Sequence, residues 1–280
     1  MKIPVLITLC CWLASSAEAP KKLAIEQALL AQSEDGTPVP SDYEFLPGDS
    51  VFFSCRVSGF AKQGDEPPKM YVSYKVEARD PRGVLIVPED SGKVAADLAP
   101  EDKEWRPIIR ATLALPPLAA TGRYDVKVIV RDELAKTETE ISVPLRIRGR
   151  GVEASDSLIV RNFRFLRSED DKDPLQVAAY RPGDTVWARF DMTGYKIGEK
   201  NRYDVEYGLK VLRPTGETTY EMAKAANDKN ETFYPQHHTP GVLSLALPKH
   251  LKAGRYTVVL TVRDNLGGQT FEMRPTFDVE

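Results

Sequence analysis

The chain has 280 residues, 42% hydrophobic and 28% charged, with a formal net charge of −3. An intrinsically disordered chain is excluded, because such chains lack the apolar content that offsets the entropy of ordering. The charge argues against binding to nucleic acid or to an anionic membrane, since both need a basic surface. The length suffices for two compact domains with their own cores.

The first residues have the order of a secretory signal peptide. Lys2 precedes a mostly apolar run, Ile3–Leu13, and small residues follow it. We expect residues 1–17 to be removed by cleavage after Ala17, with Ala19 as the second possible position. An apolar run of about 11 residues is too short for the roughly 20 that a membrane-spanning helix needs. The segment therefore predicts export to a secreted or periplasmic location, without a transmembrane span.

Cleavage would remove Cys10 and Cys11 and leave Cys55 as a single thiol. No intramolecular disulfide is then possible, so the fold must depend on its hydrophobic cores. Cys55 lies among the inward-facing positions of an alternating segment, which favours an inert buried residue over a redox thiol.

The sequence repeats itself. Phe45–Val51 returns as Tyr180–Val186, a shift of 135, and Leu113–Leu134 returns as Leu245–Leu266, a shift of 132 with 12 of 22 positions identical. We interpret this as a duplicated domain. The boundaries that follow are 21–148 for the first copy, 149–155 for the linker and 156–280 for the second copy.

Each copy is predicted to be all-β. Apolar and polar residues alternate over 51–57 and 124–130, and again over 186–192 and 256–262. Pro-Gly-Asp and Pro-x-Gly turns separate such segments, and about seven strands in ~125 residues are typical of a β-sandwich. The fold class expected is two tandem antiparallel β-sandwiches, immunoglobulin-like or macroglobulin-like. Helix is scarce, although Glu221–Ala226 has the composition for a turn or two.

Two repeated details support a sandwich. Gly122-Arg123-Tyr124 and Gly254-Arg255-Tyr256 open the penultimate strands, where a tyrosine hydroxyl commonly ties a loop to its strand. The same strands end in Arg-Asp, at Asp132 and Asp264, for which we expect a turn-closing ion pair or a side-chain cap.

These motifs resemble a known group of domains. Tyr-x-Pro-Gly-Asp-Thr-Val at 180–186 and Arg-Pro-x-Gly at 213–216, followed by Leu-x-Leu-Pro and Gly-x-Tyr-x-Val, are similar to the sandwich domains of α-macroglobulins and to bacterial immunoglobulin-like modules of exported proteins. The resemblance implies a sandwich used outside the cytoplasm. The thioester motif Gly-Cys-Gly-Glu-Gln is absent, since Cys55 lies in Ser-Cys-Arg, so protease trapping does not carry over.

Candidate chemistry is sparse. His237 and His238 are adjacent, but side chains of adjacent strand residues point to opposite faces and no third ligand stands at metal spacing. The acidic turn 168–173 contains oxygen ligands of the kind calcium takes, yet its counterpart at 33–38 keeps only two of the acids, which favours a solvated turn. We therefore expect no catalytic, cofactor or metal site. Asn230-Glu231-Thr232 is a glycosylation sequon, meaningful only in a eukaryotic secretory host.

The middle segments, 84–112 and 217–244, differ most between the copies, and we interpret them as loops that are free to bind. Candidate partner-binding residues are Trp105, Arg106, Tyr220, Phe233, Tyr234, His237 and His238. An alternative role for these aromatics is to cap the cores. The functional hypothesis is an exported, non-catalytic binding or structural protein of the cell envelope or exterior, with a protein or glycan partner. The alternative is a secreted hydrolase or an accessory subunit of an envelope enzyme.

Overall fold

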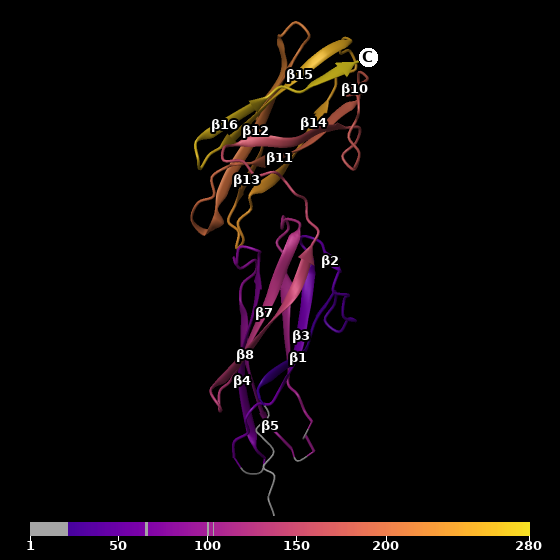
Figure 1. The fold of residues 1–280 in the computed structure, drawn as a ribbon. Helices are drawn as coiled ribbons and strands as arrows, with labels where there is room; N and C mark the ends of the chain where they lie inside the picture. The colour runs from indigo at the N-terminus through magenta and orange to yellow at the C-terminus, as the bar shows by residue number, and fades with distance from the viewer. Residues whose placement is uncertain (1–21, 65–66, 100, 103) are drawn as a thin grey trace, which may run out of the picture.

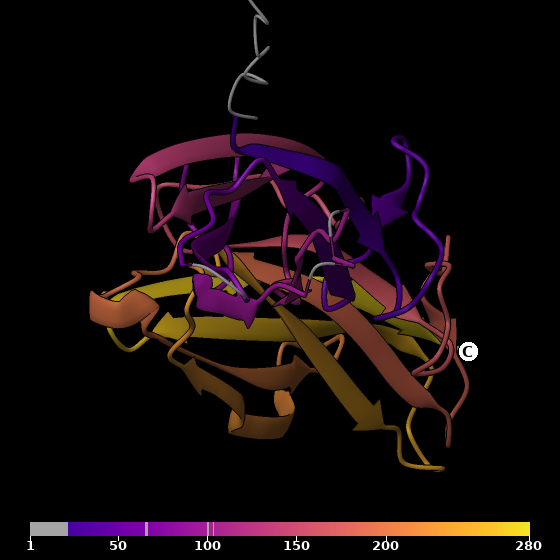
Figure 2. The same cartoon turned by 90° about the horizontal axis from the view of Figure 1, so that it is seen from below.

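The computed structural model describes residues 22–64, 67–99, 101–102 and 104–280. Two groups of β-sheets follow each other along one long axis (Figure 1), and they overlap in projection when viewed along that axis (Figure 2). The predicted signal peptide and its cleavage positions lie outside the described residues. Within the described ranges, no helical segment has the length and apolarity needed to cross a bilayer.

The N-terminal sandwich consists of two facing sheets. The first sheet has the order β1-β3-β6 and the second the order β2-β8-β7-β4-β5. The strands are β1 (Ala24–Ala31), β2 (Glu44–Phe45), β3 (Ser50–Ser58), β4 (Lys69–Arg79), β5 (Asp90–Asp97), β6 (Ile108–Ala114), β7 (Gly122–Asp132) and β8 (Thr137–Ile147).

The C-terminal sandwich repeats this arrangement. Its sheets have the orders β9-β11-β14 and β10-β17-β15-β12-β13, with β16 also paired to β15. A short 3-10 turn, Glu199–Asn201, precedes β12. The strands are β9 (Ile159–Leu166), β10 (Ala179–Tyr180), β11 (Thr185–Thr193), β12 (Tyr203–Leu212), β13 (Thr218–Asn230), β14 (His238–Ala246), β15 (Gly254–Asp264), β16 (Gln269–Met273) and β17 (Thr276–Val279).

The two strand orders are the same when each strand is matched with its counterpart in the other sandwich. The all-β fold with antiparallel sheets is confirmed, and the short pairs β2–β8 and β10–β17 are its parallel exceptions. Descent of both sandwiches from one duplicated domain stays a prediction. Even a local irregularity recurs, since Gln27 and Asn162 have positive φ angles of 50° and 52° at bulges in β1 and β9.

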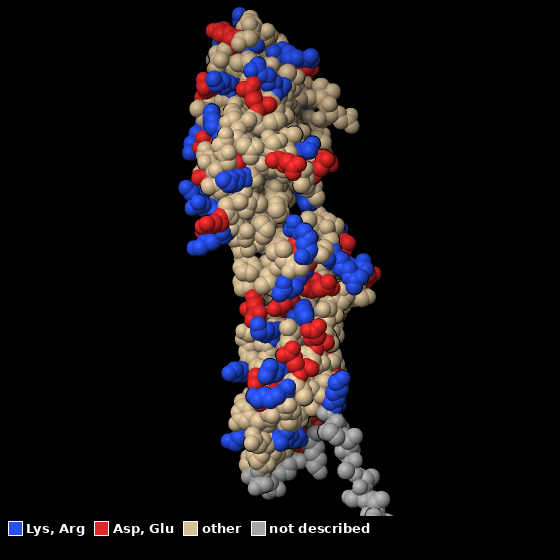
Figure 3. All heavy atoms as spheres, turned by 60° about the vertical axis from the view of Figure 1, so that its left-hand side comes forward, with Lys and Arg blue, Asp and Glu red and all other residues tan. Residues whose placement is uncertain are grey.

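Each sandwich has its own hydrophobic core, formed by the alternating residues that the sequence pattern identified. Cys55 is 1% exposed in the N-terminal core. Burial raises the pKa of its thiol to about 12, because the thiolate would lose its hydration. The predicted burial of this thiol is confirmed, and its low reactivity stays a prediction. On the outer face shown in Figure 3, basic and acidic side chains are intermixed along the length of the molecule.

The structure contains both features that recur in the sequence, the tyrosine corners and the aspartate caps. The hydroxyl of Tyr124 donates to the carbonyl of Ala120 at 3.0 Å, and that of Tyr256 to the carbonyl of Lys252 at 2.8 Å. These bonds confirm the predicted tyrosine corners.

Asp132 and Asp264, each 1% exposed, act as side-chain caps. Asp132 accepts from the backbone N–H groups of Leu134 and Ala135 in its own turn, and from that of Ala61 across the sandwich at 2.5 Å. Asp264 makes the same three kinds of contact, including one from the N–H of Lys196 at 2.8 Å. The carboxylates therefore close the turn and fix the loop after β3 or β11, as a cap and not as an ion pair.

Two expectations were wrong. Glu221–Ala226 belongs to strand β13, because pairing with β12 provides partners for its backbone, which outweigh local propensity. The middle segments 84–112 and 217–244 are not free loops. They contain β5, β13 and most of β6 and β14, so only the connections between these strands remain irregular.

Candidate functional site

The seven candidate residues lie in three places. Trp105 and Arg106 lie at the free end of the N-terminal sandwich, in the β5–β6 connection at residues 98–107. Phe233, Tyr234 and His237 belong to the β13–β14 connection at 231–237, here called the junction loop, and His238 begins β14. Tyr220 lies on β13, at the end of the C-terminal sandwich that is remote from the junction. The structure therefore brings four of the seven candidates together at the junction, and the other three lie at the two remote ends.

The junction loop extends from the C-terminal sandwich to the top of the N-terminal one (Figure 1) and is held in place by side chains of its own sandwich. The amide of Asn201 donates to the carbonyls of Thr232 and Phe233, the latter at 2.6 Å. The hydroxyls of Tyr195 and Tyr203 donate to the backbone and side-chain oxygens of Gln236, both at 2.7 Å. These bonds fix the loop backbone before it meets the other sandwich.

Tyr234 makes the contact across the junction. Its ring packs against the hydrophobic core of the N-terminal sandwich, and its hydroxyl donates to a carboxylate oxygen of Asp80 at 2.9 Å. Burial first, and then the bond to the Asp80 carboxylate, raise the pKa of Tyr234 to about 12. Asp80 is itself held by the backbone N–H groups of Arg82 and Val84, both at 2.9 Å. Tyr234 is therefore an interdomain contact in this structure.

The linker supplies a second contact. Arg150 forms an ion pair of 2.8 Å with Asp191, whose side chain is 1% exposed, and Asn162 donates to the same carboxylate oxygen at 2.9 Å. At Gly149 the chain passes so close to Ala119 that an added Cβ would lie 1.9 Å from its carbonyl oxygen. The predicted linker is thus fixed to both sandwiches.

The two histidines lie beside these contacts. His238 is 9% exposed, and His237 is half-buried with its backbone carbonyl bound by the Thr193 hydroxyl at 2.8 Å. Burial lowers the pKa of both imidazoles, and for His237 the charge of Arg82 lowers it further. Within the described ranges, no cluster of three histidine, cysteine or acidic side chains is arranged to hold a metal ion.

In the acidic turn, a carboxylate oxygen of Asp171 accepts from the backbone N–H groups of Arg167 and Ser168.

The free end of the N-terminal sandwich has a different character. Trp105 is 38% exposed, and the Phe60 ring meets it edge-on at 6.4 Å between centroids. Arg106 pairs with Glu26, which also accepts from the Ser58 hydroxyl at 2.6 Å. Exposed lysines, Lys22 and Lys62, line the same hollow. The result is an accessible aromatic surface bordered by charges of both signs.

Trp105 and the junction loop occupy the same place in their respective sandwiches. The shift of 132 aligns Trp105-Arg106 with His237-His238, and the β5–β6 and β13–β14 connections both link one sheet to the other. In the C-terminal sandwich this connection contacts the neighbouring sandwich. In the N-terminal sandwich it lies at the end of the described part that is remote from the junction (Figure 1).

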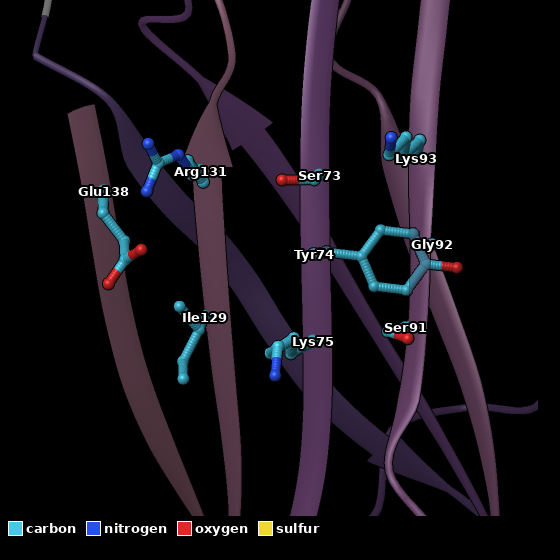
Figure 4. Close-up of a pocket in the computed structure, with 9 residues that line it drawn as sticks. All are labelled: Ser73, Tyr74, Lys75, Ser91, Gly92, Lys93, Ile129, Arg131 and Glu138. Carbon is cyan, nitrogen blue, oxygen red and sulfur yellow. The ribbon is translucent and has the colours of Figure 1, made fainter. Parts of the chain in front are cut away.

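Two further hollows are present. At the end of the C-terminal sandwich remote from the junction, Tyr220, 36% exposed, borders a small hollow with Leu251 and Tyr256. The other hollow lies on the outer face of β8, β7, β4 and β5 (Figure 4). On the core-facing side of the same strands, the Tyr74 ring lies across β5 at Gly92, where an added Cβ would be 2.6 Å from the tyrosine hydroxyl oxygen. Sequence reasoning missed this surface. Its signal was the glycine opposite a tyrosine on paired strands.

Comparisons with known proteins identify no family. No family model matches the chain, and no curated protein matches it. Among solved structures it is similar to the C-terminal domain of the Streptococcus pyogenes antigen I/II-family protein AspA (9% identity, TM-score 0.31, 92% of this chain and 99% of that one). It is also similar to the Streptococcus agalactiae BspA C-terminal domain (10%, TM-score 0.30, 92% and 100%).

A third similar structure is the Pseudomonas fluorescens alkylpurine DNA glycosylase AlkC bound to DNA containing an abasic site analog. It shares 12% identity at a TM-score of 0.29, over 44% of this chain and 30% of that one. The likeness to all three structures is too weak to transfer a function.

Proposed function

We propose that this protein is an exported, non-catalytic binding module in which two sandwiches act as one stiff unit, with the partner-binding surface at the free end around Trp105. The signal-type N-terminus and the resemblance to extracytoplasmic sandwich domains support export. The proposal also assigns both sandwiches to the type found in α-macroglobulins and in bacterial immunoglobulin-like modules.

The observation that carries the proposal is the contrast between two equivalent connections. The junction loop is held by Asn201, Tyr195 and Tyr203, and it buries Tyr234 against the neighbouring sandwich. The corresponding connection at the free end leaves Trp105 38% exposed beside Phe60. Large aromatic side chains with a polar edge are enriched in protein interfaces, because they contribute much contact area for little ordering entropy. The rim of Arg106, Glu26 and lysines offers polar contacts of both signs.

The test uses the purified full chain as bait on extracts and glycans of the envelope of the producing cells. Trp105→Ala should abolish capture of the specific partner and leave the melting temperature unchanged, because the ring is largely outside the core. Phe233→Ala is the matched control, since Phe233 is 51% exposed at the junction and should retain capture. Equal capture by the Trp105 variant, or a loss of stability without a loss of binding, would overturn the proposal.

Export has its own test. Mass spectrometry of the protein recovered outside the cytoplasm should find a chain that begins near Glu18. Retention of residues 1–17 would contradict the predicted cleavage.

A further inference from the structure

The outer face of the β9-β11-β14 sheet carries an arrangement that neither the cores nor the junction accounts for. Along β11, Val186, Ala188 and Phe190 point into the core, so Trp187 and Arg189 lie on the opposite, outer face. Arg164 of β9 is the direct cross-strand partner of Arg189. Two like charges directly opposite each other on a sheet repel, which costs stability. We call Arg164 and Arg189 the arginine pair.

The guanidinium groups of the pair are incompletely bonded. The Nε atoms of Arg164 and Arg189, and that of nearby Arg161, are buried and have no hydrogen-bond partner among the residues that the structure describes. A buried donor without a partner costs about 1–3 kcal/mol, so a folded protein that retains several of them in one place needs a reason.

Within the described ranges, neither arginine of the pair forms an ion pair with a carboxylate. Arg189 donates to the backbone carbonyl of Glu169, and Arg161 pairs with Glu153 at 3.4 Å. The carboxylate of Asp191, two residues along β11, is occupied by Arg150 and Asn162. The pair therefore has no carboxylate in direct contact among the described residues, although the acidic turn 168–173 lies next to Arg189.

The other sandwich shows that the scaffold does not require the pair. The shift of 135 places Leu29 and Ser54 at these two positions, again as direct cross-strand partners, and Phe52 at the position of Trp187. The fold thus tolerates an uncharged pair. The arginines are a property of the C-terminal sandwich alone.

We propose that the arginine pair and Trp187 form a binding site for an acidic saccharide, with a sulfate or carboxylate of the sugar on the guanidinium groups. Planar guanidinium groups bind such oxyanions with two parallel hydrogen bonds, and at this pair the terminal guanidinium nitrogens, not the buried Nε atoms, would make them. Trp187 lies on the same face, next to Arg189 along β11 and diagonal to Arg164, where its indole offers an apolar surface to a sugar ring. Beside Arg189 on β14, Val242 is 39% exposed, so the sheet face is accessible on that side.

Isothermal titration of the full chain with a sulfated oligosaccharide (heparin-derived), a carboxylated one (oligogalacturonate) and a neutral one (a dextran oligomer) tests this site. We expect binding of at least one acidic oligosaccharide and none of the neutral one. Arg164→Leu/Arg189→Ser, which installs the residues of the other sandwich, should weaken it by tenfold or more. Trp187→Ala should weaken the binding of the oligosaccharide more than the binding of inorganic sulfate.

The matched control is Arg255→Ser/Arg274→Ser, which removes two exposed arginines of the same sandwich outside this sheet and should change affinity by less than about twofold. The melting temperature of the arginine-pair variant should be unchanged or higher, because repulsion is relieved. Three results would overturn the site: no binding of either acidic oligosaccharide, equal loss in the control, or a lower melting temperature of the arginine-pair variant. Unchanged partner capture through Trp105 in the same variant separates this test from that of the proposed function.

Discussion

The two sandwiches share their strand order and polar caps, but they fill one point of their cores in opposite ways. In the N-terminal core, Cys55 of β3 faces Ile109 of β6. At the equivalent point of the C-terminal core, Phe190 of β11 faces Gly241 of β14. A Cβ added to Gly241 would lie 2.3 Å from the Phe190 ring, so the glycine is required by the phenylalanine. At this point the N-terminal core pairs a small side chain with a larger one, and the C-terminal core pairs a large aromatic ring with a glycine, which has no side chain.

This difference separates two kinds of constraint. Groups that bond to the backbone, such as Tyr124 and Tyr256 or Asp132 and Asp264, are the same in both sandwiches because their partners are the invariant peptide groups. Core side chains need only fill a volume together, and compensating exchanges are tolerated at constant packing.

The largest effect should come from breaking this compensation. Gly241→Ile forces a branched side chain into the space of the Phe190 ring, and we expect a loss of about 3 kcal/mol or more in the free energy of unfolding of the C-terminal sandwich. Phe190→Cys alone should cost about 3–5 kcal/mol through the cavity that it leaves. Urea unfolding measures both changes.

The double variant Phe190→Cys/Gly241→Ile installs the pair of the N-terminal core. It should be markedly more stable than the sum of the single variants implies, with a coupling of about 1–3 kcal/mol. Additive losses in the double-mutant cycle would refute volume compensation.

The aspartate caps should rank next. Asp132→Ala and Asp264→Ala each leave three backbone N–H groups without their acceptor, and we expect each sandwich to lose about 2–3 kcal/mol. Asp125→Ala, an exposed position on β7, is the control and should change stability by less than about 0.5 kcal/mol. A large asymmetry between the two caps would show that they are not equivalent devices.

Smaller losses are expected at the tyrosine corners. Tyr124→Phe and Tyr256→Phe should each destabilise their own sandwich by about 1–2 kcal/mol, because the carbonyl of Ala120 or Lys252 loses its donor. Differential scanning calorimetry checks both. Unmoved melting temperatures in both variants would mean that the corner bonds contribute nothing.

The smallest effect is a pH dependence between pH 7.5 and 5.0, the range in which histidine titrates, that only the C-terminal sandwich should have. Burial lowers the pKa of His238 in the folded state, so its share of stability is present above the unfolded pKa of about 6.5 and is lost as the pH falls. The aligned residue in the other sandwich is Arg106, which stays charged. Urea unfolding at pH 7.5 and 5.0, followed through Trp187 and Trp105 in variants that retain one of the two, should show acid destabilisation in the Trp187 signal. His238→Gln should reduce it, and equal acid sensitivity of both signals would contradict the assignment.

The sequence was sufficient for features that depend on neighbouring residues or on repetition. Period-two alternation predicted the inward faces of β3, β7, β11 and β15, and the Gly-x-Tyr motif predicted both tyrosine corners. Features that depend on pairing across the chain were not accessible. Glu221–Ala226 is a strand because β12 provides its hydrogen bonds. Tyr234 contacts Asp80, which lies 154 positions earlier, so no local pattern could indicate this interdomain contact.

The candidate site was predictable only in part. Trp105 and Tyr234 have the same residue character in the sequence, an aromatic ring among polar neighbours in a divergent segment. What distinguishes them is that Tyr234 has a second sandwich to contact. The arginine pair was hidden because the cross-strand register of Arg164 and Arg189 follows a bulge at Asn162, which no local pattern reveals.

We expect the junction loop to join the two sandwiches into one stiff unit, while the equivalent connection around Trp105 stays accessible to a partner. Backbone ¹⁵N relaxation of the full chain measures this coupling, because two rigidly joined sandwiches share one rotational correlation time. We predict a single correlation time for both sandwiches in the wild type, and separate, shorter ones in Tyr234→Ala/Arg150→Ala. Separate correlation times in the wild type would show that the two sandwiches move independently and that the junction loop does not hold them together.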